Sequence, residues 1–199
     1  VDSQARMSKT MENHLTGDPR LDVLFEPGSA SGGVQAGMPN GSTGSDYTDL
    51  NGNTVPGIAT RHAYSAVASA LQGRDVPMVF QTYAEVEFLK AEAAIRGWIS
   101  ADPKAHYEAG VTAAMKMLKQ IYPGTTAIPQ DDIDAYLSGP GAYDASKGWE
   151  MCMNEYWKAT YLNHHEAWFN WRRTGYPTLS PTKHPSGVTG GKIMRRMFY

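Results

Sequence analysis

The chain has 199 residues, of which 41% are hydrophobic and 19% are charged, and its net charge is −2. These values are typical of a folded chain with one real core or two small ones, and they argue against a disordered polypeptide. The small net charge gives no general attraction for nucleic acid, and no stretch reaches the roughly 18 apolar residues of a membrane span. The single cysteine, Cys152, excludes an internal disulfide framework. Because Cys152 lies between two methionines in a helical pattern, we predict a buried, inert thiol.

The N-terminal part of the chain is rich in turns. Residues 1–57 contain nine of the 20 glycines, and the Asn-Gly pairs at 40–41 and 51–52 are strong turn signals. We therefore predict mostly loop here, with short extended pieces such as residues 21–25. Residues 61–71 predict a short helix that ends at Gly73.

Residues 78–96 predict a helix with two apolar faces. Between the faces, Glu92 and Arg96 have the favourable i,i+4 spacing. A helix with two apolar faces is expected to pack against neighbours on both sides. The first face is Val79, Tyr83, Val86, Leu89 and Ala93, and the second is Ala84, Phe88, Ala91 and Ile95.

A second helix follows closely, because Gly97 ends the first one and Asp102-Pro103 is a typical helix start. One apolar seam then predicts an antiparallel pairing with the preceding helix. Residues 83–117 together are typical of a tetratricopeptide-type helix pair, and one such pair cannot bury its own faces. We therefore expect the chain to be the C-terminal part of something longer. The residues of the seam are Tyr107, Val111, Ala114, Leu118 and Ile121.

The C-terminal third predicts a short helix at residues 131–137 and a long helix at about 149–173. Gly175 and Pro177 end the long helix, and Arg172 and Arg173 in its last turn complement the helix dipole. The basic residues Lys192, Arg195 and Arg196 are interpreted as a solvated or ion-paired terminus. The long helix carries one aromatic-rich stripe, formed by Met153, Trp157, Tyr161, His164, Trp168 and Trp171.

No catalytic or metal site emerges from the sequence, so we predict neither an enzyme nor a cofactor. His164 and His165 are adjacent on a helix and point about 100° apart, which disfavours chelation of one ion, and His164 is expected to be a hydrogen-bonded core residue. We interpret Glu150, Glu155 and Glu166 as an ion-paired helix surface. No Gly-x-Ser-x-Gly nucleophile motif is present.

A binding surface remains as the functional hypothesis. Exposed aromatic rings flanked by polar side chains suit sugars, whose C–H faces stack on a ring while their hydroxyls form hydrogen bonds. Tyr47 is the best single candidate, and we predict a ligand site formed by Tyr47, Asp49, Asn51, Arg61 and Tyr64. The wider set of aromatics expected in or beside loops is Tyr47, Tyr64, Trp98, Tyr136, Tyr143 and Trp149.

Four blocks of sequence, in this order, resemble the SusD/RagB family of outer-membrane nutrient-binding lipoproteins, in its SusD-like branch. They are TGDPRLDVLF at 16–25, AEVEFLKAEAAIRGW at 84–98, EAWFNWRRTGYPTLSP at 166–181 and KIMRRMFY at 192–199. The second and third blocks are specific, and the first and last fall at the expected places.

The resemblance implies a mostly α fold, an α-α superhelix in which tetratricopeptide-like helix pairs form a scaffold and a loop-rich region carries the ligand site. Residues 1–76 would be the segment with ligand-site loops, and residues 77–199 the last helix pair with the C-terminal helix and loops. The resemblance further implies a glycan or other nutrient ligand, a SusC-like TonB-dependent transporter as partner, and an outward-facing position on the outer membrane. Membrane attachment would come only through a lipid anchor upstream of these residues.

Two other functions stay open at the level of sequence. A helical-repeat adaptor would bind a protein along the Trp157, Tyr161 and Trp168 seam. A glycoside hydrolase would need two carboxylates about 5–10 Å apart in a cleft.

Overall fold

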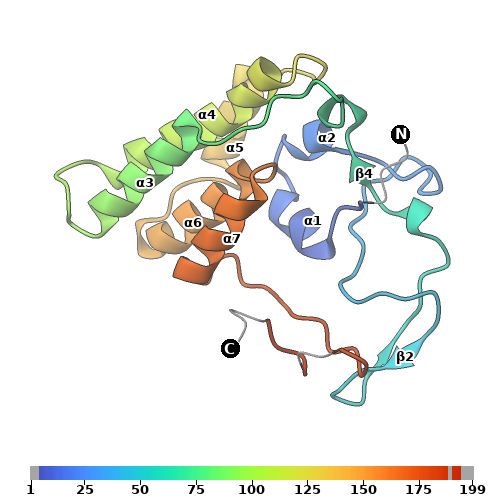
Figure 1. The fold of residues 1–199 in the computed structure, drawn as a ribbon. Helices are drawn as coiled ribbons and strands as arrows, with labels where there is room; N and C mark the ends of the chain where they lie inside the picture. Colours follow the sequence, from blue (N-terminus) through green and yellow to red (C-terminus); the bar gives the residue numbers. More distant parts are fainter. Residues whose placement is uncertain (1–4, 188–189, 194–199) are drawn as a thin grey trace. The chain divides into compact units, whose positions relative to one another are not determined.

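The computed structural model describes residues 5–187 and 190–193 and is mostly helical, as predicted (Figure 1). Arg195 and Arg196 of the predicted basic terminus lie outside these residues. The elements, in chain order, are α1 (Lys9–Leu15), α2 (Leu21–Leu24), β1 (Phe25–Glu26), β2 (Tyr47–Thr48), β3 (Thr54–Val55), η1 (Arg61–Ala63), β4 (Ala66–Val67), η2 (Ser69–Leu71), α3 (Tyr83–Ile95), α4 (Pro103–Ile121), α5 (Gln130–Ser138), η3 (Ala145–Lys147), α6 (Gly148–Ala159) and α7 (His164–Thr174).

The chain divides into two compact units. Residues 1–13, 25–67 and 179–199 form the first, called the loop unit, and residues 14–24 and 68–178 form the second, called the helical unit. The described residues of the loop unit form two antiparallel two-stranded sheets, in which β1 pairs with β4 and β2 pairs with β3. The ladders are only two residues long, so turns and loops make up most of this unit. That residues 1–76 act together as a ligand-binding segment stays a prediction.

The helices α3 and α4 form the predicted hairpin and pack side by side (Figure 1). The first helix begins at Tyr83 rather than at residue 78, because Thr82 and Glu85 form a capping box at this point. Its end at Gly97 is as predicted, since Gly97 adopts a positive φ of 71°. Asp102 caps α4 by accepting a hydrogen bond of 3.0 Å from the backbone N–H of Lys104.

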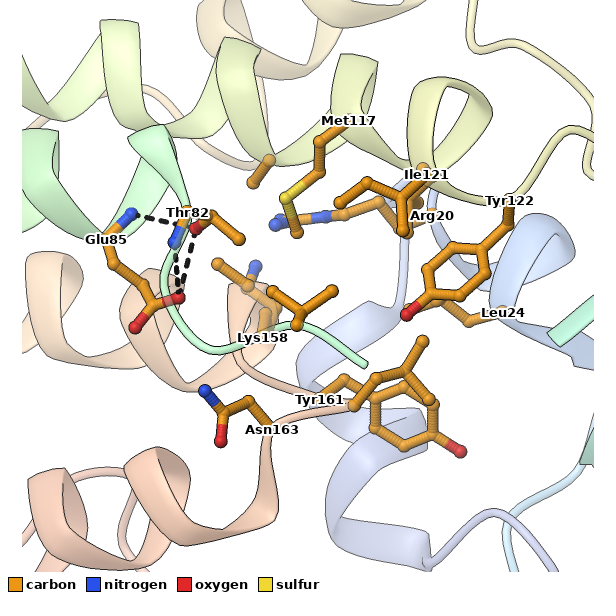
Figure 2. A pocket seen from close by; sticks show the side chains of 15 residues that line it. Arg20, Leu24, Thr82, Glu85, Met117, Ile121, Tyr122, Lys158, Tyr161 and Asn163 are labelled. Carbon is orange, nitrogen blue, oxygen red and sulfur yellow. Dashed lines mark hydrogen bonds between the residues drawn. The ribbon is translucent and has the colours of Figure 1, made fainter. Parts of the chain in front are cut away.

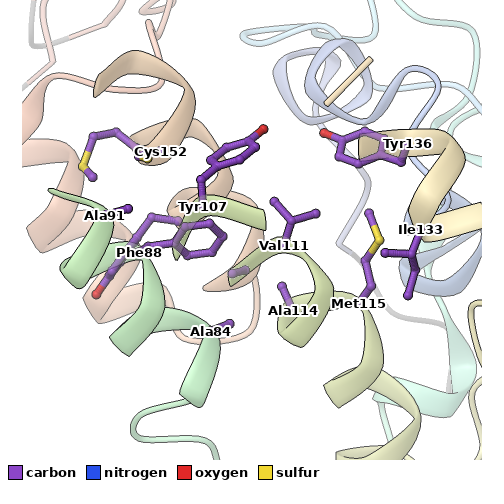
Figure 3. Close-up of a cluster of buried hydrophobic side chains, with 13 residues drawn as sticks. Ala84, Phe88, Ala91, Tyr107, Val111, Ala114, Met115, Ile133, Tyr136 and Cys152 are labelled. Atoms are coloured by element: carbon purple, nitrogen blue, oxygen red, sulfur yellow. The ribbon is translucent and has the colours of Figure 1, made fainter. Parts of the chain in front are cut away.

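The core of the helical unit lies between α3, α4, α5 and α6 (Figure 3). The predicted seam of α4 is buried at Tyr107, Val111, Ala114 and Leu118. A Cβ atom at Gly110 would lie 2.7 Å from the Phe88 ring, so a glycine here lets the two helices approach closely. The other main members of the core are Ala84, Ala91, Met115, Ile133, Tyr136, Cys152, Met153 and Tyr156.

Only one of the two predicted apolar faces of α3 is covered within the described residues. Ala84, Phe88 and Ala91 are buried on the covered face. On the other face Tyr83 is 64% exposed and Leu89 is also exposed, so the prediction of neighbours on both sides is wrong for this part of the chain. Among the described helices, α4 and α6 pack against α3, and they cover the face that contains Ala84, Phe88 and Ala91.

The predicted helix at 149–173 is two helices, because a turn at residues 160–163 separates α6 from α7. The Thr160 hydroxyl donates to the Tyr156 carbonyl at 2.9 Å, and the Asn163 N–H donates to the Thr160 carbonyl at 2.8 Å. The Thr160 hydroxyl shares the Tyr156 carbonyl with the Thr160 backbone N–H, and the Asn163 bond reaches back three residues instead of four, so the regular helical pattern ends here. The Asn163 side chain then donates to the Phe80 carbonyl at 3.1 Å, a contact with a residue far away in the sequence.

The break splits the predicted aromatic stripe. Trp157 remains on α6 and lies edge-on to His14, whereas Trp168 and Trp171 stack on each other on α7, with ring centres 5.1 Å apart. Trp171 is buried, but Trp168 is partly exposed. His164 starts α7 and is exposed, so the prediction of a buried core histidine is wrong.

Two shorter predictions are also corrected. Residues 61–71 form η1, β4 and η2 instead of one helix, because the backbone of Ser65 bonds to neighbouring segments: its N–H donates to Ala36 and its carbonyl accepts from Met7, both at 2.8 Å. Residues 21–25 form the single turn α2 followed by the start of β1, not one extended piece. The short helix predicted at 131–137 is confirmed as α5.

The end of α7 is fixed to α3 by Arg173. Its guanidinium forms a two-pronged ion pair with Glu92, in which Nη2 lies 2.7 Å from Oε2, and the same nitrogen donates to Asn170 Oδ1 at 2.8 Å. The Glu92 side chain is only 4% exposed and also accepts from Arg96 Nε at 2.9 Å, which confirms the predicted i,i+4 pair. Arg173 therefore has a structural role in the helical unit.

We expect Arg173→Ala to lower the free energy of unfolding by about 1–3 kcal/mol, because it removes charge-assisted hydrogen bonds from a buried carboxylate. Arg172→Ala is the matched control: Arg172 is the exposed neighbour in the same helical turn, and its loss should cost within about 0.5 kcal/mol. Urea denaturation followed by circular dichroism measures both. Equal stability of the two variants would contradict this role.

Candidate functional site

The predicted ligand residues Tyr47, Asp49 and Asn51 lie together on the hairpin formed by β2 and β3. Asp49 organises the turn, because its Oδ1 accepts from the backbone N–H groups of Asn51 and Asn53, each at 2.8 Å. These hydrogen bonds, with that from Asn53 first, lower the pKa of the Asp49 carboxyl, so it is ionised at neutral pH. Gly52 has φ of 84°, as the Asn-Gly turn signal predicts.

The Tyr47 side chain is half-buried at the foot of this hairpin. Its ring lies 4.4 Å from the ring of His184, with an angle of 51° between the planes. A Cβ atom at Gly41 would lie 3.1 Å from the Tyr47 hydroxyl oxygen and closer still to Thr182, so the glycine leaves room for this arrangement. No local sequence pattern indicates that His184 contacts Tyr47. The hairpin therefore presents an aromatic ring, a carboxylate and an amide on one short turn.

Arg61 and Tyr64 lie in a different part of the loop unit. Arg61 begins η1 and Tyr64 ends it, and the Arg61 carbonyl accepts from Arg6 Nε and from the Tyr64 N–H, both at 3.1 Å. In Figure 1 the segment that leads into β4 lies apart from the β2 hairpin. Both side chains are half-buried. The five predicted residues thus form two groups rather than one, and their binding of a ligand stays a prediction.

The remaining aromatics of the predicted surface set have different surroundings. Tyr136 is buried on α5, so its placement in this set is wrong. Tyr143 and Trp149 are half-buried and pack against the core. Trp98, in the loop between α3 and α4, is the strongly exposed member, at 69%.

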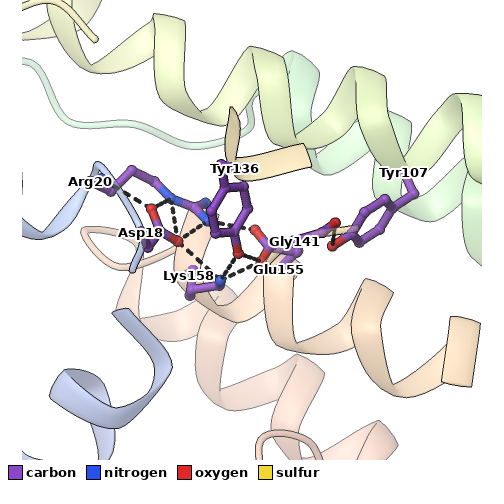
Figure 4. Close-up of polar contacts among 7 residues, drawn as sticks. All are labelled: Asp18, Arg20, Tyr107, Tyr136, Gly141, Glu155 and Lys158. Atoms are coloured by element: carbon purple, nitrogen blue, oxygen red, sulfur yellow. Dashed lines mark hydrogen bonds and ion pairs between the residues drawn. The ribbon is translucent and has the colours of Figure 1, made fainter. Parts of the chain in front are cut away.

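A cluster of buried charges lies in the helical unit (Figure 4). The Arg20 guanidinium contacts Asp18 Oδ1 at 2.9 Å through Nε and Glu155 Oε2 at 2.6 Å through Nη2. The Lys158 ammonium lies 3.1 Å from Asp18 Oδ2 and also pairs with Glu155. Two carboxylates are thus balanced by two cations, and the side chains of all four residues are at most 5% exposed. Tyr136 joins the cluster by donating to Glu155 Oε1 at 2.6 Å.

Both carboxyls of this cluster are held in the ionised form. Burial alone would raise the pKa of Asp18 and that of Glu155, but the charges of Arg20 and Lys158 outweigh burial and lower both pKa values. A general acid needs a raised pKa, so neither group suits that role. Glu155 was predicted on an ion-paired surface; it is ion-paired but buried, because residues 18–20 cover this side of α6.

Glu85 is the carboxyl with the opposite behaviour, because burial raises its pKa. It lines a small cavity of about 20 Å³ together with Thr82, Lys158 and Asn163 (Figure 2). That volume holds about one water molecule, and no sugar ring fits it. Glu85 also completes the capping box with Thr82 and accepts from the Tyr156 hydroxyl at 3.4 Å. Its contacts are therefore those of a structural residue.

Cys152 is buried as predicted, and burial, followed by the charges of Glu155 and Glu92, raises its pKa to about 12, so the thiolate is not populated at neutral pH. Among the described residues, no group of three or more His, Cys, Asp or Glu side chains is arranged to hold a metal ion. In the same part of the chain no helix has the length and apolarity needed to cross a membrane.

The sequence model of a SusD-like family, described as starch-binding and associating with the outer membrane, matches residues 2–199. The chain belongs to the SusD-like family. This match confirms the family that the four blocks of sequence resemble. No curated protein sequence matches this SusD-like chain.

Solved structures share the fold of this SusD-like chain. A chitin-binding protein is 30% identical, with a TM-score of 0.80 over 98% of this chain and 43% of its own. A Bacteroidetes AC2a SusD-like protein is 25% identical, with a TM-score of 0.73 over 90% of this chain and 44% of its own. A chitin-binding SusD homolog from Flavobacterium johnsoniae, at 21% identity and a TM-score of 0.65, covers 92% of this chain and 40% of its own and shows the fold alone. The SusD-like chain thus spans less than half the length of these proteins.

We expect Arg20→Ala to lower the free energy of unfolding of this SusD-like chain by about 3–5 kcal/mol, because it leaves two buried carboxylates with Lys158 as their single cation. The control is Lys104→Ala, which removes an exposed i,i+4 pair with Glu108 and should cost about 0–1 kcal/mol. Chemical denaturation at pH 7 measures the difference. A loss from Arg20→Ala no larger than that of the control would show that the cluster does not stabilise the fold.

The same cluster predicts a pH dependence. Because the pKa values of Asp18 and Glu155 are lower in the folded state, unfolding takes up protons in acid, and stability present at neutral pH is lost as the pH falls below their ordinary values of 3.8 and 4.5. The free energy of unfolding, measured from pH 7 down to pH 3, should fall more steeply in the wild type than in Arg20→Ala. Parallel curves would contradict the assignment of the low pKa values to Arg20.

Proposed function

We propose that this chain belongs to a non-catalytic protein that binds a nutrient glycan at the cell surface and delivers it to a SusC-like TonB-dependent transporter. The observation that carries the proposal is the family match over residues 2–199, to a family described as starch-binding and associating with the outer membrane. The 30% identical solved protein, described as chitin-binding, supports a glycan as the ligand. An outward-facing position on the outer membrane, with a lipid anchor upstream of these residues, belongs to the same proposal.

The β2–β3 hairpin is the proposed centre of ligand binding. A sugar ring offers an apolar C–H face and a rim of hydroxyls, which suit an aromatic ring with nearby carboxylate and amide groups. Tyr47, Asp49 and Asn51 supply these groups on one turn whose backbone is fixed by the Asp49 hydrogen bonds. Arg61 and Tyr64 would be a second group of contacts in the same loop unit.

The carboxylates support a binding role over hydrolysis. A glycosidase places a proton-donating acid and a second carboxylate on either side of a cleft that admits the sugar. Here Asp18 and Glu155 are neutralised by Arg20 and Lys158, and Glu85 borders a space of about 20 Å³. Asp18, Glu155 and Glu85 therefore have partners within the fold.

The adaptor alternative loses the surface on which it was based. It required Trp157, Tyr161 and Trp168 on one continuous helix face. The turn at residues 160–163 places them on two helices and in the turn between, and Trp157 packs against His14. A protein-binding groove along this seam is therefore not proposed.

The test is isothermal titration of the chain with chitohexaose and maltoheptaose. We expect one of them to bind, and we expect Tyr47→Ala to weaken that binding about tenfold or more, equivalent to ~1.4 kcal/mol. The matched control is Thr48→Ala, because Thr48 is the next residue of β2 and its side chain points to the other side of the strand. Thr48→Ala should leave the affinity unchanged.

Each other outcome has a distinct meaning. Binding that persists in Tyr47→Ala would reject the hairpin as the ligand site and leave the glycan function standing. If neither saccharide releases or absorbs heat in the titration, the proposal that the ligand is a glycan is rejected. A peptide library in the same titration would then test another nutrient. Rapid cleavage of either sugar by the protein, monitored by chromatography, would contradict a non-catalytic role.

A further inference from the structure

The exposed indole of Trp98 is held on a rigid part of the helical unit. The backbone N–H of Trp98 donates to the Ala93 carbonyl at 2.8 Å, and the backbone N–H of Gly97 donates to the Ala94 carbonyl at 3.0 Å. With Gly97 at positive φ, these two bonds form a Schellman motif, which fixes the backbone at the end of α3. The residue at this position commonly packs against the last helical turn, whereas Trp98 leaves 69% of its surface exposed.

Arg96 orients this ring. Its guanidinium carbon lies 5.0 Å from the centre of the Trp98 ring and 4.4 Å from that of the Trp149 ring. Glu92 holds the guanidinium in place through Arg96 Nε, and Arg173 binds the same carboxylate. A cation over the face of an indole is attracted to its π electrons. The contact therefore fixes one face of the indole on Arg96 while most of the ring remains in water.

We infer that Trp98 is a second saccharide-binding position, separate from the Tyr47 hairpin. The inference rests on the proposed glycan-binding function. A pyranose ring would stack its C–H face on the exposed indole, and Arg96, whose guanidinium has donors besides the Nε–H taken by Glu92, would donate to the sugar hydroxyls. Ordering the ring in advance reduces the entropy lost on binding.

The two positions lie in different units of the chain, Trp98 in the helical unit and Tyr47 in the loop unit. A single stacked ring binds weakly, so Trp98 alone matters little for a short oligosaccharide that occupies the hairpin. A polysaccharide presents many rings, and a second contact then acts at high effective concentration. Trp98 should accordingly affect retention on a polymer more than affinity for an oligomer.

The direct test observes the Trp98 indole itself. In 15N-labelled chain, the indole N–H signal of Trp98 is assigned by its loss in Trp98→Phe, and chitohexaose and maltoheptaose are titrated into the wild type and into Tyr47→Ala. We expect a saturable shift of this signal at millimolar sugar in both proteins. If isothermal titration detects binding of a sugar but the Trp98 indole signal does not shift, this inference is overturned and the proposed function stands. If neither measurement detects binding, both are overturned.

Retention on insoluble chitin and on starch granules gives the second measurement. Trp98→Ala should lower retention about 3- to 10-fold, whereas Ile99→Ala, which removes the exposed neighbour in the same loop, should not. The thermal midpoint of each variant separates loss of binding from loss of folding. Retention of correctly folded Trp98→Ala equal to that of the wild type would overturn the inference. If a peptide shifts the Trp98 signal and the sugars do not, Trp98 belongs to a protein contact, and the inference is overturned as well.

Discussion

The helical unit depends on one buried cluster of four charges. Asp18 and Arg20 come from the connection between α1 and α2, and Glu155 and Lys158 come from α6, so the cluster joins segments far apart in sequence. In an interior of low dielectric, one of these charges without its partners would cost several kcal/mol. If the segment around residue 18 left α6, Asp18 would lose Lys158 and Glu155 would lose Arg20. This constraint fixes the short N-terminal part of the unit to its C-terminal helices.

A second charged cluster positions the ends of the helices. Glu92 near the end of α3 binds Arg96 on its own helix and Arg173 near the end of α7. Because Arg96 also contacts Trp98 and Trp149, the same carboxylate determines where the exposed indole lies. Charged groups in the helical unit thus stabilise and orient, and the side chains available to a ligand lie in turns at the ends of regular elements.

Buried charges that stabilise the fold and exposed aromatic rings in turns agree with the SusD-like family and with the proposed glycan function. Binding a sugar requires flat rings and hydrogen-bonding groups on a rigid frame, without a proton donor of raised pKa. The Tyr47 turn is made rigid by Asp49, and the Trp98 turn is made rigid by a Schellman motif. Two anchored aromatic turns in separate units would suit a ligand made of repeated rings.

The local features could be predicted from the amino-acid sequence: the hairpin of α3 and α4 with its glycine and aspartate caps, the Asn-Gly turn beside Asp49, and the family. Caps and periodicity act over a few residues, so they can be recognised without knowing the rest of the chain. The break at residues 160–163, the burial of Glu155 and the contact of Tyr47 with His184 depend on the folded structure. Each of these depends on a partner distant in sequence, such as the Phe80 carbonyl for Asn163 or Arg20 for Glu155, and no local pattern specifies that partner.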